Sequence, residues 1–199
     1  YSGSPESAID FDIRQLYEQG FESYGKALIS GELSDAYWEA SLPQEMNTSS
    51  SISPYFRVFK AAQVKLGDKG FLSKDMTCRD MILNRCDVHH IYPRNHLKKQ
   101  GLKRGRYNQI ANYALTQTEI NIAISDKNPD IYLSEMLDQC NGGPSCYGRI
   151  ASKEELRSNF EMNCIPKPIL EGEILPYDDF PIERRKLMAQ RIKTYFQTL

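Results

Sequence analysis

The chain has 199 residues, of which 40% are hydrophobic and 11% aromatic, and this is enough apolar material to bury at least one core. Its mean hydropathy is -0.56, and no apolar run approaches the roughly 20 residues of a membrane span. We therefore expect neither a transmembrane segment nor a signal peptide. The formal net charge is -1, which at first sight argues against a polyanionic partner.

The charges, however, are unevenly distributed along the chain. Residues 84–107 contain seven basic residues and one acid, and residues 183–193 contain five basic residues and one acid. These local charges of +6 and +4 leave -11 for the remaining sequence, because the total is -1. The pattern suits a polyanion-binding site on an acidic body, although two solvated basic faces would produce the same pattern.

The cysteines are odd in number and lack the paired C-x-x-C spacing of zinc ribbons. In a chain of this size we expect them to be small buried hydrophobic residues in a reducing cytoplasm, rather than disulfide partners or zinc ligands. They are Cys78, Cys86, Cys140, Cys146 and Cys164.

Helical patterns dominate the first third of the chain. Apolar residues at three- and four-residue steps predict an amphipathic helix over residues 7–28, broken near Gly20. A short helix is expected over residues 33–41. A third helix is predicted over residues 54–66, opened by its proline and ended by Gly67.

The middle of the chain predicts strand, long loop, strand and helix in that order. Residues 81–93 have β character and end at a proline, and residues 112–117 are a second strand candidate. Between them, residues 94–107 have no apolar face worth burying, so we expect an exposed basic loop with at most one helical turn. Residues 119–139 are helical in pattern, with an interruption at Pro129.

The last third of the chain predicts a turn-rich loop at 140–149, a helix over 151–163 and a final amphipathic helix over 181–199. We expect three parts that together form one compact domain: an N-terminal helical part at 1–85, a finger at 86–135 and a C-terminal helical part at 136–199.

The three histidines lie within eight positions, and two of them, His89 and His90, are adjacent. Hydrolysis of a phosphodiester requires an activated water and a positive group that neutralises the phosphate and the leaving oxygen. Imidazole accepts a proton near pH 7, and Mg²⁺ or Mn²⁺ accepts nitrogen and amide oxygen ligands together with water. A pair of histidines followed by asparagines across a basic segment therefore contains a complete set of groups for this reaction.

The motif "DVHHIYP", with Asn112 twenty-two residues after His90 and Asn121 nine residues further on, resembles the HNH (ββα-metal, or His-Me finger) nuclease motif. The resemblance implies that His89 is a metal ligand, His90 the general base, Asn112 a support for the hairpin and Asn121 the second metal ligand. Asp87 is an alternative or outer ligand, because it shares a strand face with His89. His96 falls outside this motif.

A wider resemblance covers nearly the whole chain. The segments "SPESAIDFDIRQL", "GFLSKD", "YNQIANY", "NCIP" and "RRKLMA" are similar to the C-terminal region of GmrSD-type restriction proteins, bacterial defence nucleases that act on modified phage DNA. Full-length members carry an upstream nucleotide-dependent module. Because the chain begins at Tyr1 and has no glycine-rich P-loop, we interpret it as the nuclease part, which itself binds no nucleotide.

The resemblance implies an α+β protein, mainly α-helical with an inserted ββα-metal finger, that nicks DNA with one Mg²⁺ or Mn²⁺ ion per site. Double-strand cleavage would require two protomers or two nicks, so a homodimer is an expected assembly. The alternatives are a catalytically silent DNA-binding or regulatory module and an RNase toxin of the same fold. The expected DNA contacts, each weighed against a role in solubility or packing, are Arg94, Lys98, Lys99, Lys103, Arg104, Arg106, Lys127, Arg184 and Arg185.

Overall fold

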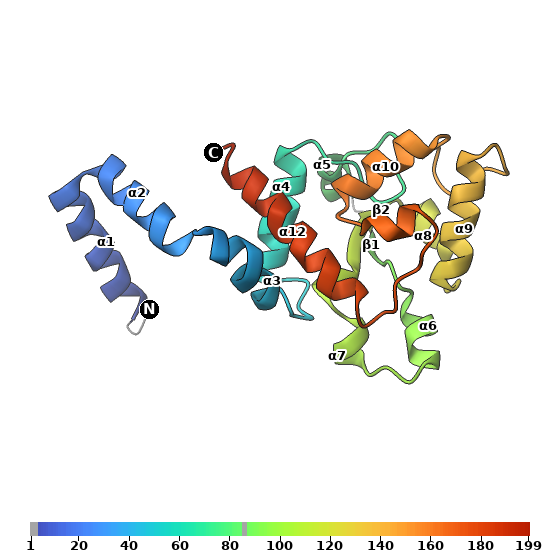
Figure 1. The fold of residues 1–199 in the computed structure, drawn as a ribbon, viewed down its shortest axis with the longest axis horizontal. Helices are drawn as coiled ribbons and strands as arrows, with labels where there is room; N and C mark the ends of the chain where they lie inside the picture. Colours follow the sequence, from blue (N-terminus) through green and yellow to red (C-terminus); the bar gives the residue numbers. More distant parts are fainter. Residues whose placement is uncertain (1–3, 85–86) are drawn as a thin grey trace.

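The computed structural model describes residues 4–84 and 87–199, so Arg85 and Cys86 lie outside the described residues. Within this part, the chain is mainly helical and contains one antiparallel sheet of two strands (Figure 1). The α+β class predicted from the sequence is therefore confirmed. The strands are β1 (Asp87–His90) and β2 (Tyr113–Thr116). The helices are α1 (Pro5–Gln19), α2 (Phe21–Glu32), the π-helix η1 (Tyr37–Ser41), α3 (Leu42–Glu45), α4 (Pro54–Lys65), α5 (Cys78–Leu83), α6 (Arg94–Lys99), α7 (Arg104–Tyr107), the 3-10 turn η2 (Ile110–Asn112), α8 (Thr118–Ile124), α9 (Pro129–Cys140), α10 (Lys153–Met162), α11 (Lys167–Leu170) and α12 (Phe180–Phe196).

Helices α1 and α2 stand away from the rest of the protein (Figure 1). The predicted break at Gly20 is confirmed, and this glycine adopts a φ of +78°. Helix α1 buries none of its side chains, although it is amphipathic in sequence. Its apolar residues, among them Ile9 and Tyr17, are largely exposed.

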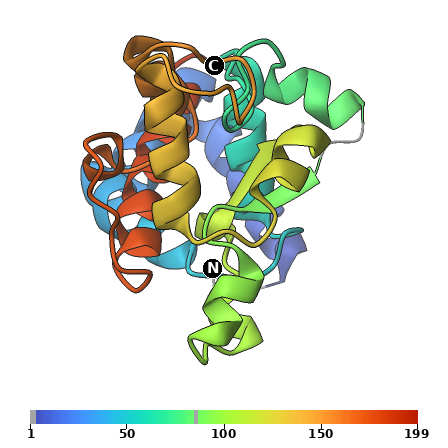
Figure 2. The same ribbon diagram turned by 90° about the vertical axis from the view of Figure 1, so that its right-hand side faces the viewer.

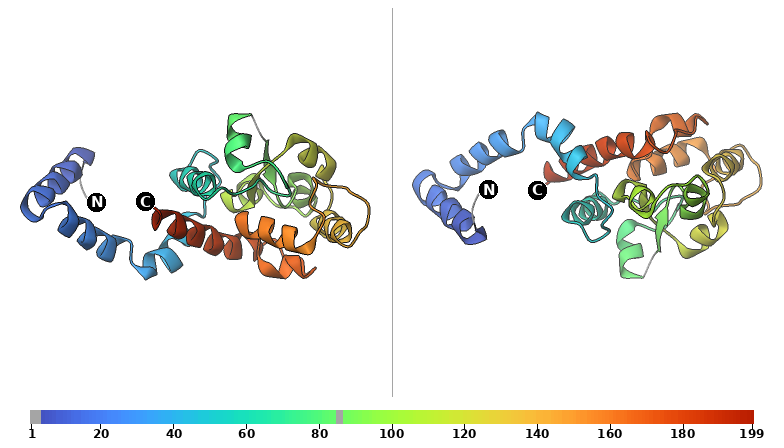
Figure 3. Two further views of the ribbon diagram at one scale, coloured as in Figure 1. Left: turned by 90° about the horizontal axis from the view of Figure 1, so that it is seen from above. Right: turned by 90° about the horizontal axis from the view of Figure 1, so that it is seen from below.

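Two large core clusters and a small third one, formed by Cys78, Met81 and Leu115, hold the remaining elements together. The first contains Phe71, Leu97 and Tyr132, and the second joins α4 to α12 through Phe59 and Met188. Figure 3 shows α12 (red) lying across α4 (teal), which is seen nearly end-on. The predicted start of α4 at Pro54 and its end before Gly67 are confirmed, because Ser53 accepts a hydrogen bond from the N–H of Phe56 and caps the helix.

The sheet lies between these two clusters. In β2, Tyr113 belongs to the second cluster and its neighbour Ala114 to the first, because successive side chains of a strand point to opposite faces. The register pairs His90 with Tyr113 and His89 with Ala114. The two adjacent histidines are therefore directed toward different cores.

The segment around β1 differs from the prediction in three places. Residues 81–83 are helical rather than extended, because a capping box between Thr77 and Asp80 starts α5. Ile91 and Tyr92 follow the strand but lie outside it, buried in the first core. The loop predicted at 94–107 contains two short helices, α6 and α7, which project from one end of the sheet (Figure 2).

The C-terminal half follows the predicted order, with two refinements. Pro129 begins α9 after a break at the end of α8, as expected for a proline at the first helical position. The boundary predicted at residue 135 falls inside α9, and the four-residue helix α11 was not predicted. Among the described helices, none is both long and apolar enough to cross a membrane.

Candidate functional site

Strand β1 presents its two histidines in opposite directions. His89 is only 3% exposed and contacts Asn121 of α8, whereas His90 is partly exposed and contacts Asn108. Asp87 shares the face of His89 because it lies two positions earlier in the same strand. The structure therefore separates the pair into one buried and one accessible imidazole.

Asn121 links Asp87 to His89. Its Nδ2 donates to a carboxylate oxygen of Asp87 at 3.2 Å, and its Oδ1 lies 2.8 Å from Nδ1 of His89. An ionised carboxylate can only accept, so the Asn121 amide must turn its NH₂ group toward Asp87 and its oxygen toward the ring. In this arrangement Nδ1 of His89 carries the proton and donates it to Asn121.

The ring of His89 is enclosed by aromatic side chains. It stacks on Phe71 with 5.9 Å between ring centroids and meets the edge of Tyr132 at 6.5 Å. Its Nε2 is buried and has no hydrogen-bond partner within the described part of the chain. Burial lowers the pKa of His89 to about 4, so the ring is neutral at pH 7 and has a nitrogen lone pair available.

The side chains of His89, Asn121 and Asp87 suit one hard divalent ion. Neighbouring ligands of an octahedral ion with bonds of about 2.1 Å lie about 3 Å apart, and the 2.8 Å between His89 Nδ1 and Asn121 Oδ1 is close to this separation. Coordination through Nδ1 would move the ring proton to Nε2, for which the described residues offer no acceptor. No group of three His, Cys, Asp or Glu side chains within residues 4–84 and 87–199 could hold a metal. Water and a substrate phosphate would therefore complete the ligand shell, and a closed zinc site is not supported.

His90 is held by groups from two segments. Its Nε2 lies 2.9 Å from Oδ1 of Asn108, and its ring meets Tyr113 edge-on at 5.0 Å between centroids. Burial lowers the pKa of His90, and the positive charge of Arg94 lowers it further, against the opposing effect of Asn108. When Nε2 donates to Asn108, the lone pair of Nδ1 is the basic position of a neutral ring.

Asn108 was not predicted as a site residue. It lies eighteen residues after His90, in a segment whose composition predicts a polar loop, and no motif marks it. Only the folded arrangement of α7 and β1 brings its side chain to the histidine. The aromatic enclosure of His89 by Phe71 and Tyr132 was also missed, because both residues come from outside the motif.

Asn112 holds the backbone around the site. It is fully buried, and its Oδ1 accepts from the N–H of Tyr92 at 2.8 Å while its Nδ2 donates to the carbonyl oxygens of Tyr92 and Tyr107 at 3.1 Å each. A side chain in this position supports the turn after β1 and cannot touch a substrate. Its place in the predicted catalytic set is therefore that of a support.

Replacement of Asn112 by alanine is expected to lower the free energy of unfolding by about 3 kcal/mol or more, because each of the buried backbone groups that lose this partner costs about 1–3 kcal/mol. Denaturant unfolding followed by circular dichroism measures the loss. Asn84→Ala is the matched control, since Asn84 is exposed and bonds one carbonyl at a helix end. Equal losses in the two variants would contradict the supporting role.

Six of the predicted DNA contacts lie together on the projecting segment of α6 and α7. All six side chains are exposed, although Lys99 lies 3.6 Å from Asp126 and Arg106 pairs with Asp178. They are Arg94, Lys98, Lys99, Lys103, Arg104 and Arg106. His96 lies on α6 beside Gln100 and is not part of the His89 or His90 cluster.

The prediction that Arg184 contacts DNA is wrong. Its side chain is fully buried, and its four hydrogen bonds go to main-chain carbonyl oxygens of Ala111, Tyr113 and Asn163. Burial lowers the pKa of Arg184 to about 10, so it remains charged at pH 7. A buried arginine cannot reach a phosphate, and it instead fastens α12 to the segment that contains Asn112.

Lys127, another of the expected DNA contacts, is partly exposed and is paired within the protein. Its ammonium lies 2.8 Å from Glu135 and donates to the hydroxyl of Tyr147 at 2.8 Å. The Glu135 carboxylate holds the pKa of Lys127 above its usual range. These bonds join the start of α9 to the following loop, which is a structural role. Arg185 remains partly exposed and donates weakly to Asn47 at 3.3 Å.

The cysteines divide by location. Cys78 and Cys164 are buried, as expected for small hydrophobic residues, whereas Cys140 is half-buried and Cys146 is exposed. Cys86 lies outside the described residues. Burial raises the pKa of the Cys164 thiol to about 12, so it is not a reactive thiolate.

Comparisons with known proteins identify no relative of this chain. No protein-family model, no curated protein and no solved structure matches it. The HNH interpretation therefore depends on the motif and on the geometry around β1.

Proposed function

We propose that the chain is a metal-dependent DNA endonuclease domain with an HNH (ββα-metal) finger, and that it nicks one strand. The observation that supports this most is the arrangement of side chains around β1. Asp87 and His89 form one hydrogen-bonded group with Asn121 of α8, and His90 lies on the other face of the strand. A set of nitrogen and oxygen donors and a neutral, partly exposed imidazole, carried by neighbouring residues of one strand, are the groups that a metal-assisted hydrolase requires.

The finger consists of β1, the basic segment with α6 and α7, β2 and α8. Asn112 joins the two sides of this loop, and α8 brings Asn121 to β1. The exposed basic residues of α6 and α7 supply phosphate contacts beside His90, since Arg94 is close enough to influence its pKa. The order of elements and the contacts of both asparagines support the finger.

In this mechanism His90 accepts a proton from water at Nδ1 while Asn108 holds Nε2. A neutral ring is required for this step, and burial and Arg94 both favour the neutral form by lowering the pKa of His90. His89, Asn121 and Asp87 would hold one Mg²⁺ or Mn²⁺ ion, which neutralises charge on the scissile phosphate and the departing 3'-oxygen. Asn112 and Arg184 fix the backbone on which these groups stand.

The biological setting is part of the same proposal. The resemblance to the C-terminal region of GmrSD-type proteins suggests a bacterial cytoplasmic defence nuclease that acts on DNA, including modified phage DNA. An upstream nucleotide-dependent domain of the same protein and a second protomer are the partners it implies. The exposed apolar face of α1 is compatible with either partner.

The experiment that tests the enzyme proposal uses supercoiled plasmid and the purified chain. With Mg²⁺ or Mn²⁺ we expect conversion to the open circular form, and with EDTA we expect none, because the metal-ligand side chains alone do not neutralise the leaving oxygen. DNA binding without metal-dependent cleavage would favour the silent module. Cleavage of single-stranded RNA in preference to DNA would favour the RNase toxin.

A further inference from the structure

A pocket of about 520 Å³ lies outside the predicted motif. Its walls come from the segment after α3, from α7 and the residues that follow it, and from the start of α12 with the segment that leads into it. Gln109, which lines it, directly follows Asn108, the hydrogen-bond partner of His90. Because consecutive Cα atoms are about 3.8 Å apart, the pocket begins one residue away from the group that holds the proposed base.

The pocket has an excess of positive charge. The charged residues of its lining are Arg106, Arg185 and Asp178, so two positive charges stand against one negative charge. Asn47 and Gln109 add amide groups. Tyr177 donates to the carbonyl oxygen of Arg106 at 2.8 Å, which fixes the wall that carries this guanidinium. Burial lowers the pKa of Arg185, so its partly desolvated guanidinium interacts with an anion more strongly than a fully solvated one would.

Arg106 is already paired within the protein. Its guanidinium bonds to Asp178, but both side chains are largely exposed, at 64% and 74%. Exposed ion pairs of this kind are weak, whereas a phosphate accepts two parallel bonds from an arginine. A phosphate that enters the pocket can therefore displace Asp178 from Arg106.

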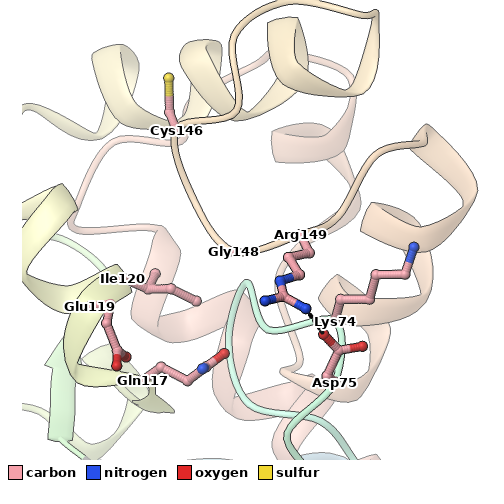
Figure 4. A pocket seen from close by; sticks show the side chains of 8 residues that line it. All are labelled: Lys74, Asp75, Gln117, Glu119, Ile120, Cys146, Gly148 and Arg149. Atoms are coloured by element: carbon pink, nitrogen blue, oxygen red, sulfur yellow. Dashed lines mark ion pairs between the residues drawn. The ribbon is translucent and has the colours of Figure 1, made fainter.

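A second pocket shows that this charge balance is not general. It has a volume of about 440 Å³ and is lined by Lys74 and Arg149 together with Asp75 and Glu119. Figure 4 shows Arg149 directed at Asp75, with which it forms an ion pair at 3.9 Å. Its two cations are offset by two acids, so it offers no net attraction to a phosphate.

We propose that the pocket lined by Arg106 and Arg185 binds a backbone phosphate of nucleic acid, and that Asp178 is an internal counterion released from Arg106 when this phosphate enters. The inference rests on the proposed function and adds a second, regulated contact to the same site.

The test measures binding of a fluorescent 20-base-pair DNA in EDTA, so that cleavage is not involved, as a function of salt concentration. Each phosphate contact contributes about -0.9 to the slope of log K against log salt. For Arg185→Gln we expect a slope about 1 unit shallower and about 5- to 10-fold weaker binding near 100 mM salt. For Asp178→Asn we expect tighter binding and a slope that is steeper by up to about 0.9. The reason is that Arg106 no longer has to break its pair with the Asp178 carboxylate, so its contact with the phosphate is made with release of salt ions alone.

The pair Arg149 and Asp75 supplies the matched control, since Arg149→Gln and Asp75→Asn change an exposed pair in the neutral pocket. Neither should alter the slope. Arg106→Gln is the second variant, chosen because Arg106 is exposed and its replacement cannot be dismissed as a folding defect. Unchanged slopes in both Arg185→Gln and Arg106→Gln would overturn the pocket.

Two further outcomes are informative. One distinguishes a free phosphate from a nucleic-acid phosphate as the ligand, and the other distinguishes failure of the pocket proposal from failure of the endonuclease proposal. If calorimetry with ATP or inorganic phosphate shows binding that Arg185→Gln abolishes, while DNA binding is unaffected, the ligand is a free phosphate and the nucleic-acid assignment is wrong. If the slopes change as expected in a protein that does not nick plasmid, the pocket stands and the endonuclease proposal fails.

Discussion

Replacement of His90 by alanine is expected to slow metal-dependent plasmid nicking by about 10²- to 10⁴-fold, the usual contribution of a general base. The physical reason is that His90 offers a neutral imidazole in the accessible half of the site, held at Nε2 by Asn108 and against Tyr113. DNA binding in EDTA should stay within about twofold of wild type, because phosphate contacts rather than His90 determine the affinity. Single-turnover nicking rates and fluorescence anisotropy measure the two quantities.

His96→Ala is the matched control for this prediction. His96 lies on α6 at the surface side of the same segment and bonds Gln100, so its loss should leave the nicking rate within about twofold. Added imidazole should partly restore the His90 variant, since it supplies the missing base in solution. A His90 variant that nicks at the wild-type rate would show that another group activates the water.

Helix boundaries were the part of the fold most readily predicted, because they depend on local chemistry. Pro54 with Ser53 before it, Pro129 with Asn128 before it, and the glycine break at position 20 each determine an end within a few residues. These features act over one helical turn and need no information about the rest of the chain.

The orientation of the short strand β1 was harder to predict, since its apolar side chain is exposed and a polar side chain is buried, the opposite of the usual pattern. Val88 is 44% exposed, whereas His89, one residue later, is 3% exposed. A prediction that buries the apolar residue of this strand would place Val88 inside and His89 at the surface, which is the reverse of the observed orientation. The orientation is determined by Phe71, Tyr132 and Asn121, which lie between 18 and 43 residues away in sequence and meet His89 only after folding.

The residues of the candidate site that belong to the motif could be predicted from the sequence, and the residues outside the motif could not. The spacing from His90 to Asn112 and Asn121 identified two asparagines that the structure brings to β1 or to the turn after it. No spacing rule of this kind identifies Asn108. Arg184 was assigned as a DNA contact because of its charge, and this assignment was wrong. A positive side chain in a basic run is normally exposed, but here carbonyl oxygens from two distant segments form an internal site for it.

Replacement of Arg184 by methionine is expected to be among the most destabilising single changes in the protein. Methionine fills much of the same space but donates no hydrogen bond, so the carbonyl oxygens of Ala111, Tyr113 and Asn163 lose this donor in a buried environment. At about 1–3 kcal/mol for each buried group, the free energy of unfolding should fall by about 3 kcal/mol or more. For a domain of this size that corresponds to a decrease in Tm of about 6–12 °C, measured by calorimetry.

Arg184→Lys should recover only part of this loss, because an ammonium at the end of a flexible chain cannot reproduce the planar fork that reaches three carbonyl oxygens. Lys186→Met, on the exposed face of the same helix, is the control and should shift Tm by no more than about 2 °C. A Tm for Arg184→Met equal to that of the control would mean that the carbonyl groups find other donors.

The same substitution also bears on the site, because two of the carbonyl oxygens that Arg184 holds flank Asn112. Tyr113, one of these two residues, pairs with His90 across the sheet and contacts its ring. At temperatures well below its Tm, Arg184→Met should therefore nick more slowly than wild type with unchanged affinity for DNA, since His90 is less well positioned. Arg184→Lys should lie between the two, and a folded methionine variant with the full nicking rate would limit Arg184 to a role in stability.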